Sequence, residues 1–459
     1  MSGGQKARRY FGTDGIRGPV GSPVMSPDLV LRLGRAAGRV LCPDGRGKVL
    51  IGCDTRISGP VLESALEAGL ASAGANVTLL GVLPTPGIAY LTRTLGARAG
   101  VVISASHNPF QDNGIKFFGP DGRKLDDATE LAIEQALDEA FDTVPAEQLG
   151  RVERIRDSVG RYVEFCKSTV PYGLRLDGLR LVVDCAHGAA WEAAPAVLRE
   201  LGAEVVSLGV EPDGCNINDG VGSTSPGAMA ARVVETRADA GLALDGDGDR
   251  VIMADHTGAI RDGDCLLYVI ARGRQERAEL CGPVVGTVMS NLALEHALTG
   301  AGLEFLRSKV GDRHVLETLH EHGGIVGGES SGHILCLDRT STGDGVISAL
   351  QVLAEMRSRE RSLAELCEGF TPYPQRMINV RVASREAAMA DARLSEAVAE
   401  TERRLGEAGR VLVRPSGTEP VIRVMVEGRN AEQVRSEVEA LAGSVRACVG
   451  EGAESEPHH

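Results

Sequence analysis

Short apolar runs alternate with amphipathic stretches along most of this chain, and the first round of this pattern predicts four elements. They are a strand over Lys48–Cys53, a helix over Val61–Ala73 with apolar residues at 3.6-residue spacing, and strands over Val77–Leu80 and Gly100–Ile103. Strands that alternate with helices favour a mostly parallel sheet with right-handed crossovers. The pattern therefore predicts an α/β domain at the start of the chain.

Two further rounds follow. The second predicts, in chain order, the strand Leu181–Val183, the helix Glu192–Leu201, the strand Glu204–Leu208, the helix Met229–Arg237 and the strand Gly241–Leu244. The third begins near Gly263 and predicts the strand Val284–Thr287, the helix Leu292–Leu298 and the strand Ile325–Val326. No residue-level repeat accompanies the three rounds, so we expect three domains that are alike in architecture and different in sequence.

The pattern changes after about Pro372. Met377–Val382 and Val421–Val426 alternate as strands and Glu432–Leu441 is amphipathic, which predicts a smaller α+β domain. The acidic, glycine-containing end of the chain is predicted to be disordered. The predicted domains are residues 1–158, 159–260, 261–371 and 372–449, followed by a tail over 450–459.

Composition narrows the class of protein. The 459 residues carry 49 Lys plus Arg against 63 Asp plus Glu, and the net charge of −14 argues against nucleic acid or an anionic membrane as the main partner. Ten cysteines are scattered without a C-x-x-C pair, which favours reduced thiols over a disulfide framework or a zinc site. With no apolar stretch typical of a signal peptide or a membrane span, we expect a cytoplasmic location.

The first segment with candidate chemistry follows the strand that ends at Ile103. Ser106 and His107 stand in a Ser-His-Asn-Pro turn, with Lys116 a short distance downstream. An ordinary helix cap would explain such a turn. A nucleophilic or phosphorylated serine instead needs a nearby proton acceptor and cations, and His107, Lys116 and Arg17 are candidates for those roles. Arg17 belongs to a glycine-rich segment that predicts a loop.

The second candidate is an aspartate loop directly after the strand Gly241–Leu244. Asp245, Asp247 and Asp249 occupy alternate positions, and the glycines between them let three carboxylates converge on one hard cation. An EF-hand is disfavoured because its sixth and twelfth positions would be Arg250 and His256. A solvated acidic turn remains the alternative. Three oxygen ligands leave positions open, as expected of Mg²⁺ shared with a phosphate.

The third candidate also follows a predicted strand. Glu329, Ser331 and His333 offer polar side chains suited to neighbouring hydroxyls of a sugar, although turns of this composition are common.

The fourth candidate lies in the last domain. Arg414, Ser416, Gly417 and Thr418, with Arg423 beyond them, combine guanidinium forks, hydroxyls and backbone N–H groups, which makes a plausible phosphate cradle. A simple hairpin is the alternative, and the ending of a Walker A loop is missing. Together the four loops describe one site with a phosphate-carrying serine, a divalent cation, a hydroxyl binder and a second phosphate holder.

These residues resemble the α-D-phosphohexomutase family over nearly the whole chain. The motifs that carry the resemblance are Phe11-Gly12-Thr13-Asp14-Gly15-Ile16-Arg17-Gly18, Ser104-Ala105-Ser106-His107-Asn108-Pro109, Asp245-Gly246-Asp247-Gly248-Asp249-Arg250, Lys309-Val310-Gly311-Asp312-Arg313 and Arg414-Pro415-Ser416-Gly417-Thr418-Glu419. Asn113-Gly114-Ile115-Lys116-Phe117-Phe118 and Thr340-Ser341-Thr342-Gly343-Asp344-Gly345 are similar to the glucosamine branch of that family. Ser330 departs from that branch, whose members often carry Gln or Asn there.

The resemblance implies three similar α/β domains and a smaller C-terminal one around a central cleft. It implies a phosphoserine at Ser106, Mg²⁺ held by Asp245, Asp247 and Asp249 together with Ser106, and a substrate contact for Lys309. The implied reaction interconverts glucosamine 6-phosphate and glucosamine 1-phosphate through a bisphosphorylated sugar and feeds amino-sugar nucleotide and cell-wall precursor synthesis. A homodimer is also implied.

Two rival interpretations remain at this stage. The same loops would serve a phosphomannomutase/phosphoglucomutase, because every hexose phosphate presents similar groups. A non-catalytic sensor of sugar phosphates would keep the cleft for binding alone. The combination of Ser106 with three aspartates disfavours a sensor, since binding needs no nucleophile.

Overall fold

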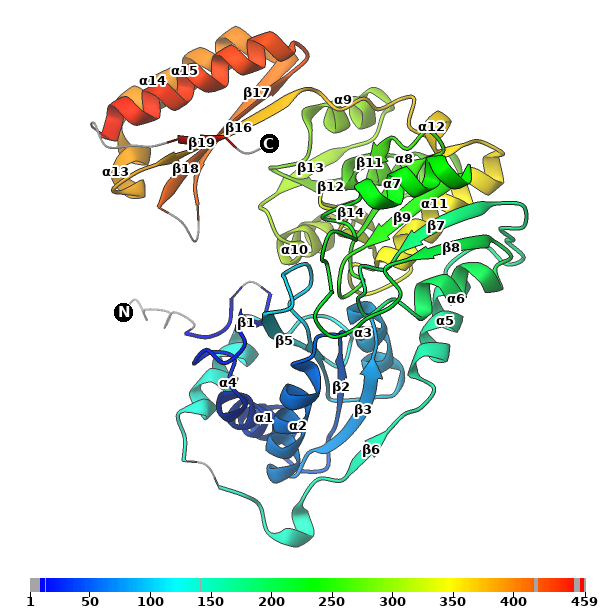
Figure 1. Cartoon of the computed structure of the whole chain (residues 1–459). Helices are drawn as coiled ribbons and strands as arrows, with labels where there is room; N and C mark the ends of the chain where they lie inside the picture. The colour runs from blue at the N-terminus through cyan, green and yellow to red at the C-terminus, as the bar shows by residue number, and fades with distance from the viewer. Residues whose placement is uncertain (1–8, 13, 141, 417–419, 450–454, 458–459) are drawn as a thin grey trace. The chain divides into compact units, whose positions relative to one another are not determined.

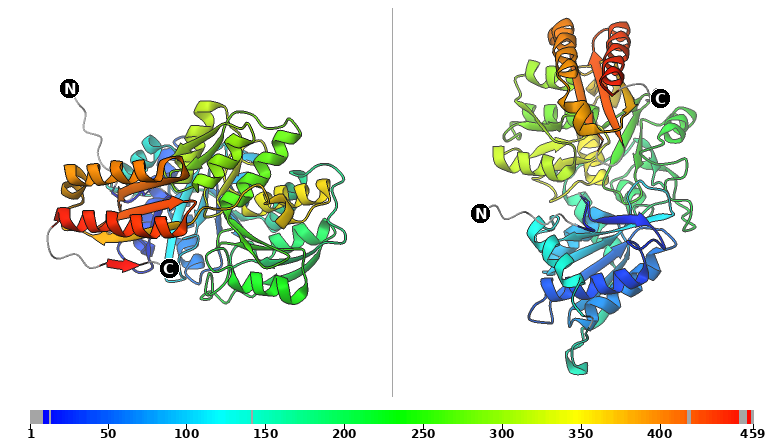
Figure 2. Two further views of the ribbon diagram at one scale, coloured as in Figure 1. Left: turned by 90° about the horizontal axis from the view of Figure 1, so that it is seen from above. Right: turned by 90° about the vertical axis from the view of Figure 1, so that its left-hand side faces the viewer.

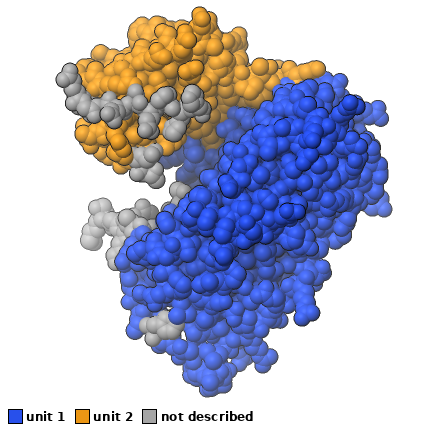
Figure 3. Space-filling model, in the orientation of Figure 1, with its two compact units in different colours: residues 1–285, 308–367 blue, residues 286–307, 368–459 orange. Residues whose placement is uncertain are grey.

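The computed structural model describes residues 9–12, 14–140, 142–416, 420–449 and 455–457. Contacts divide the chain into two compact units, which Figure 3 colours separately. Unit 1 comprises residues 1–285 and 308–367, and unit 2 comprises residues 286–307 and 368–459.

The first sheet of unit 1 has six strands in the order β1-β5-β4-β2-β3-β6. Their bounds are β1 Ile16–Pro19, β2 Lys48–Cys53, β3 Asn76–Val82, β4 Ala99–Ile103, β5 Asp112–Phe118 and β6 Val152–Arg154. The strands β4, β2, β3 and β6 are parallel, whereas β5 and β1 run antiparallel to their neighbours. The predicted loop around Arg17 is wrong at that residue, because Ile16–Pro19 pairs along β5 and completes the edge of the sheet.

Helices cover both faces of this sheet. They are α1 Pro27–Leu41, α2 Gly59–Ser72, α3 Thr85–Thr94 and α4 Asp127–Leu137. The apolar faces of α1, α2 and α4 share one buried cluster with alternate residues of the strands. Where α1 crosses α2, a Cβ at Gly34 would lie 2.5 Å from the carbonyl oxygen of Leu66, so the crossing needs glycine. A short 3₁₀ turn, Ala146–Gln148, precedes β6.

The second sheet has five strands in the order β11-β10-β9-β7-β8. Its elements are α5 Ser158–Ser168, β7 Arg180–Asp184, α6 Ala193–Glu200, β8 Glu204–Leu208, α7 Gly227–Thr236, β9 Ala240–Leu244, β10 Val251–Asp255 and β11 Ile260–Arg261. Strand β7 is parallel to β8 and β9, and β10 returns antiparallel to β9. The tight turn between β9 and β10 is the aspartate loop.

The third domain continues with α8 Gly263–Glu276, β12 Val284–Thr287, α10 Asp312–His322, β14 Val326–Gly328, β15 Ile334–Cys336, α11 Gly345–Arg359 and α12 Leu363–Leu366. Strand β12 is parallel to β14, which pairs antiparallel with β15. Residues 286–307, which hold α9 Leu292–Gly300 and most of β13 Phe305–Ser308, group with the C-terminal segment instead. One reason is that the side-chain amide of Asn291 donates to the carbonyl of Tyr373 at 3.0 Å.

Unit 2 contains an antiparallel sheet in the order β17-β18-β16-β19. Its elements are β16 Gln375–Arg381, α13 Arg385–Ala390, α14 Ala392–Leu405, the 3₁₀ turn Gly406–Ala408, β17 Gly409–Pro415, β18 Val421–Gly428, α15 Ala431–Val449 and β19 Ser455–Pro457. Figures 1 and 2 show α14 and α15 side by side over one face of this sheet, where they share its apolar cluster. The predicted succession of three α/β sheets and a smaller α+β sheet is confirmed.

Part of the predicted disordered tail is ordered. Ser455–Pro457 pairs antiparallel with Ile378–Val380 of β16, because β16 would otherwise leave backbone groups unpaired at the sheet edge. The other tail residues, 450–454 and 458–459, lie outside the described part of the chain. No helix within the described ranges combines the length and apolarity needed to cross a bilayer.

Candidate active site

Ser106 follows β4 and adopts a left-handed backbone conformation, with φ of 53°. This conformation is uncommon for a residue with a side chain, so surrounding contacts must hold it. The N–H of Ser106 donates to Ser104 Oγ at 3.0 Å, and its carbonyl accepts from Asn218 Nδ2 at 2.9 Å. The serine is buried and its hydroxyl is directed to Asp245.

Arg56 organises the remainder of the serine loop. Its guanidinium is fully buried, pairs with Asp54 at 2.8 Å, and donates to the carbonyl oxygens of Ser106 at 3.0 Å and Asn108 at 2.8 Å. The carbonyl of Asp112 accepts from the same guanidinium at 3.0 Å. One side chain thus fixes both ends of the loop that presents the serine.

The aspartate loop brings its three carboxylates together, as predicted. One oxygen each from Asp245, Asp247 and Asp249 lies within 4.8 Å of the others, and all three residues are buried. Ser106 Oγ donates to Asp245 Oδ2 at 2.6 Å. Asp247 Oδ1 and Asp249 Oδ1 are buried without a hydrogen-bond partner among the described residues. These orphaned oxygens and the nearby serine hydroxyl form a hard-oxygen donor set that fits a divalent cation.

The electrostatics of the three carboxylates agree with that fit. Burial raises the pKa of Asp245 well above its usual value, and the charges of Asp249 and Asp247 add to the effect. Burial and the charge of Asp249 also oppose ionisation of Asp247, but the charge of Lys116 and hydrogen bonds with Asp245 and Lys116 together leave its pKa lowered. Because the ionised form of Asp245 is disfavoured, a cation bound among the three carboxylates would stabilise its negative charge.

Lys116 lies on β5 and is almost completely buried among carboxylates. Its Nζ atom is 2.7 Å from Asp247 Oδ2, 3.2 Å from Asp14 Oδ2 and 3.9 Å from Asp249 Oδ2. Burial alone would lower the pKa of Lys116, but these carboxylates raise it above its ordinary value. Lys116 is therefore a fixed positive charge beside the serine and the aspartate loop.

His107 is half-buried beside the serine, with its Nδ1 atom 3.3 Å from Ser106 Oγ. Burial lowers the pKa of His107 to about 4, and the positive charges of Arg250 and Arg17 contribute. The imidazole is thus neutral near pH 7 and has a lone pair with which to accept a proton. Arg17 and Arg250 line a cavity of about 320 Å³ next to it.

The sugar-binding candidates lie on the turn between β14 and β15. Glu329 lines the same cavity, and its Oε1 accepts from the N–H of Gly311 at 3.0 Å. Ser331 is exposed. His333 is buried, with Nδ1 3.6 Å from Asp249 Oδ2 and Nε2 3.7 Å from Asp312 Oδ2. His333 therefore faces carboxylates, whereas Glu329 faces the open cavity.

The remaining candidates divide between the two units. Lys309 is exposed in unit 1. In unit 2, Arg414 and Arg423 stand opposite each other on β17 and β18, and Arg423 Nη2 is 3.5 Å from the hydroxyl oxygen of Ser416. Burial and the neighbouring positive charge of Arg423 lower the pKa of Arg414. Gly417 and Thr418 lie outside the described residues.

Several residues of the site were not predicted from the sequence. They are Asp54, Arg56, Asn218 and Thr85, which hold the serine and aspartate loops, and Asp14, Lys124 and Asp312, which surround Lys116 and His333. A signal existed for Asp54 and Arg56, because they directly follow the predicted strand that ends at Cys53, where α/β sheets place functional groups. The others depend on contacts between distant segments.

Comparison with known proteins follows the same division of the chain. Models of four phosphoglucomutase/phosphomannomutase domains match it: alpha/beta/alpha domain I at residues 8–143, domain II at 160–258, domain III at 262–373 and the C-terminal domain at 377–444. Phosphoglucosamine mutase of Alkalilimnicola ehrlichii is 61% identical over 96% of this chain and 97% of its own length. The enzyme of the same name from Halorhodospira halophila is 60% identical over 98% and 99%.

A solved structure shares the architecture. A phosphoglucomutase/phosphomannomutase family protein from Burkholderia thailandensis superposes with a TM-score of 0.82 at 27% identity, covering 97% of this chain and 98% of that one. The chain belongs to the phosphoglucomutase/phosphomannomutase family, the α-D-phosphohexomutases.

Proposed function

We propose that this protein is a phosphoglucosamine mutase that interconverts glucosamine 6-phosphate and glucosamine 1-phosphate. The observation that carries the proposal is the contact between Ser106 Oγ and Asp245 Oδ2 at 2.6 Å, inside a cluster of three buried carboxylates. A serine so placed accepts a phosphoryl group beside a cation site. Relatives named phosphoglucosamine mutase, 60% and 61% identical over almost the whole chain, support the choice of sugar.

The reaction takes two phosphoryl transfers. Phosphorylated Ser106 donates its phosphoryl group to the free hydroxyl of the sugar monophosphate, which gives a bisphosphate and an unmodified serine. The sugar then turns end for end, and Ser106 takes the other phosphoryl group. The P–O bond to serine breaks in the first step and re-forms in the second, so the enzyme returns to its starting state.

The side chains around Ser106 divide the work of these transfers. Asp245, Asp247 and Asp249 would hold Mg²⁺, which neutralises charge on the phosphoryl group in transit. Lys116, Arg17 and Arg250 supply further positive charge, since positioning and electrostatics provide most of the rate in phosphoryl transfer. His107, with Nδ1 3.3 Å from the serine oxygen, accepts the proton of the attacking hydroxyl.

The substrate contacts belong to the same proposal. Glu329, Ser331 and His333 would form the sugar-binding turn, and Lys309 would reach the substrate from the neighbouring segment. The carboxylate of Glu317, on the wall of the cavity, suits the ammonium group of glucosamine. Arg414, Ser416, Gly417, Thr418 and Arg423 would bind the phosphate that is not being transferred.

Two measurements test the function. Turnover of glucosamine 6-phosphate, glucose 6-phosphate and mannose 6-phosphate by one preparation should favour glucosamine 6-phosphate. A preference for mannose 6-phosphate or glucose 6-phosphate would favour a phosphomannomutase/phosphoglucomutase, and tight binding without turnover of any of the three would favour a sensor. Phosphopeptide mapping of the active protein should find phosphate on Ser106, and Ser106→Ala should abolish turnover. An active preparation with phosphate only elsewhere contradicts the assignment.

The location and assembly of the protein remain predictions. A cytoplasmic location should appear as activity in the cytosolic fraction of the source cells. The homodimer implied by the resemblance should give a sedimentation mass of about twice the 48.2 kDa chain.

A further inference from the structure

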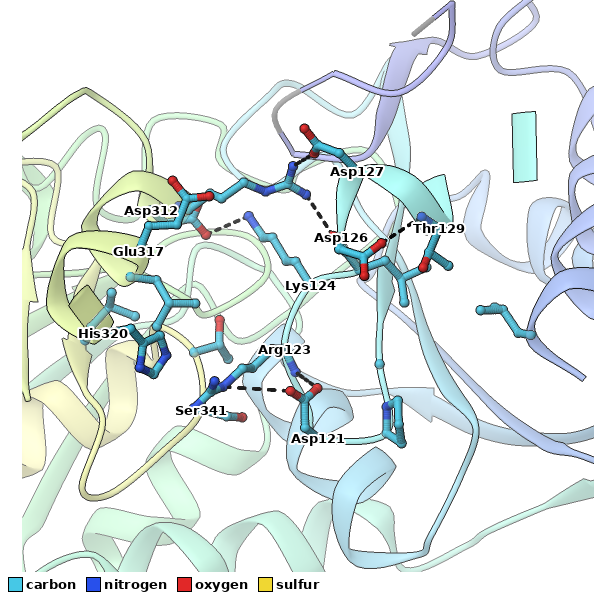
Figure 4. Close-up of a pocket in the computed structure, with 18 of the residues that line it drawn as sticks. Asp121, Arg123, Lys124, Asp126, Asp127, Thr129, Asp312, Glu317, His320 and Ser341 are labelled. Carbon is cyan, nitrogen blue, oxygen red and sulfur yellow. Dashed lines mark hydrogen bonds and ion pairs between the residues drawn. The ribbon is translucent and has the colours of Figure 1, made fainter. Parts of the chain in front are cut away.

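Lys124 connects two carboxylates that come from different domains of unit 1. Its Nζ atom donates to Asp312 Oδ2 at 2.6 Å and forms an ion pair with Asp14 Oδ1. Lys124 stands where the chain returns after β5, in an isolated bridge with Phe118. Figure 4 shows its side chain extending across to Asp312 at the start of α10. The ammonium is mostly shielded from water, since the side chain of Lys124 is 17% exposed.

Asp312 continues this connection towards the aspartate loop. Its Oδ2 atom also lies 3.7 Å from His333 Nε2, and the opposite ring nitrogen lies 3.6 Å from Asp249 Oδ2. The ring packs closely against Gly343, where a Cβ would lie 2.2 Å from Nε2. The imidazole of His333 therefore lies between the carboxylates of Asp312 and Asp249.

Asp14 completes the connection on the other side. Its Oδ2 atom lies 3.2 Å from Lys116 Nζ, which in turn lies 2.7 Å from Asp247 Oδ2. Ion pairs thus run from Asp247 through Lys116, Asp14 and Lys124 to Asp312, and the ring of His333 lies between Asp312 and Asp249. Lys124 stands at the middle of this series.

We propose that Lys124 and Asp312 form a positioning pair that fixes the aspartate loop for its cation. Lys124 does not line the 320 Å³ cavity that holds Glu329, Arg17 and Arg250; it lines a neighbouring cavity of about 670 Å³. It therefore acts through other side chains and not on the sugar. The aspartate loop would otherwise be free to spread, because its carboxylates repel one another. The pair rests on the proposed function for its role in turnover, but its effect on the cation site stands independently.

The test is the Mg²⁺ affinity of Lys124→Met, measured by calorimetry after chelator treatment. Partners that orient metal ligands typically change affinity by 10–100-fold, so we expect a dissociation constant about tenfold higher. The kcat should fall and the KM for glucosamine 6-phosphate should change little. Lys124→Arg, which keeps the charge and can reach both carboxylates, should restore much of the affinity. Asp312→Asn should have the same effect as Lys124→Met, and the double variant should be little worse than either.

Ser341→Ala is the matched control. Its hydroxyl donates to the carbonyl of Gly122 at 2.8 Å and joins the turn of Lys124 to a different segment of the third domain, the one that follows β15. The control should leave Mg²⁺ affinity within about twofold of the wild type. The proposal is overturned if Lys124→Met keeps wild-type Mg²⁺ affinity. A higher KM for the sugar phosphate would then make Lys124 a substrate contact, and a loss of thermal stability alone would make its role structural. If the wild type binds Mg²⁺ but turns over no hexose phosphate, the proposed function fails while the affinity test still decides the role of the pair.

Discussion

Replacing Lys116 with methionine is expected to destabilise the protein in proportion to the buried charges that it leaves behind. The side chain of Lys116 is 2% exposed, and its ammonium forms an ion pair with Asp247 at 2.7 Å. Removing one partner of a buried ion pair costs about 3–5 kcal/mol, because the other charge stays buried without compensation. We therefore expect Lys116→Met to lose about 3–5 kcal/mol of unfolding free energy in the presence of a chelator.

Mg²⁺ should reduce the loss of unfolding free energy that Lys116→Met causes. A cation bound among Asp245, Asp247 and Asp249 supplies the positive charge that the variant lacks, so the same concentration of Mg²⁺ should stabilise the variant more than the wild type. Turnover should stay low, because a dication at the loop does not replace an ammonium between Asp14 and Asp247. Urea unfolding, followed by the fluorescence of the single tryptophan, Trp191, gives the free energies with and without Mg²⁺.

Lys167→Met provides the comparison. Lys167 also forms two ion pairs, but its partners Glu164 and Glu200 have side chains that are 72% and 48% exposed. Exposed pairs contribute about 0–1 kcal/mol, so this variant should change little and should not respond to Mg²⁺. A loss below about 1 kcal/mol for Lys116→Met in chelator, or a loss that Mg²⁺ leaves unchanged, would refute the electrostatic argument.

Three further predictions concern other parts of the site. Burial raises the pKa of Asp344 to about 7, whereas the pKa of an unfolded aspartate is about 4. The contribution of this carboxyl group to stability is therefore full below the unfolded pKa and is lost as the pH rises towards 7. Asp344→Asn, which caps the helix equally well, should gain melting temperature relative to the wild type over that range, and a constant difference from about pH 4 to 8 would contradict this. A Cβ at Gly263 would lie 2.0 Å from the carbonyl oxygen of Glu329, so Gly263→Ala should displace the turn between β14 and β15 and raise the KM for the sugar phosphate about tenfold. An unchanged KM would show that this turn does not contact substrate. Arg56→Lys keeps a positive charge but loses the guanidinium that holds the Ser106 loop, so steady-state kinetics should show a kcat lower by about 100-fold. Full activity would mean that the loop keeps its conformation without this guanidinium.

The elements that could be predicted from the sequence are those whose cause is local. The strands β2, β8 and β12 have the predicted bounds. Strands β2 and β12 are apolar runs that the sheet buries, and β8 is a half-buried edge strand. The aspartate loop could be predicted for a similar reason, since its three carboxylates are separated by single glycines and need no distant segment to bring them together.

The remainder of the site depends on contacts that no short stretch of sequence contains. The glycines around Arg17 favour a loop, yet pairing with β5 makes a strand of Ile16–Pro19. Lys124 belongs to a polar turn whose sequence is typical of solvated surface. Its partner Asp312 comes from α10, far away in the sequence. The place of Arg56 after the predicted strand that ends at Cys53 is a signal in the sequence, but its burial against four backbone carbonyl groups is not, because arginine is mostly an exposed residue.

The proposed chemistry explains why such a large share of the site is fixed by buried polar contacts. The sugar must present first one end and then the other to the same serine, so substrate binding cannot reshape the groups around Ser106 for each half of the reaction. The left-handed backbone of Ser106 is held by Arg56 and Asn218, and Asp247 is paired with Lys116 of β5. These groups are held by contacts within the protein itself, which is the preorganisation that electrostatic catalysis requires. Under the proposed function, the two orientations of the sugar would then be accommodated by substrate-contacting residues such as Glu329 and Ser331, which lie outside this set.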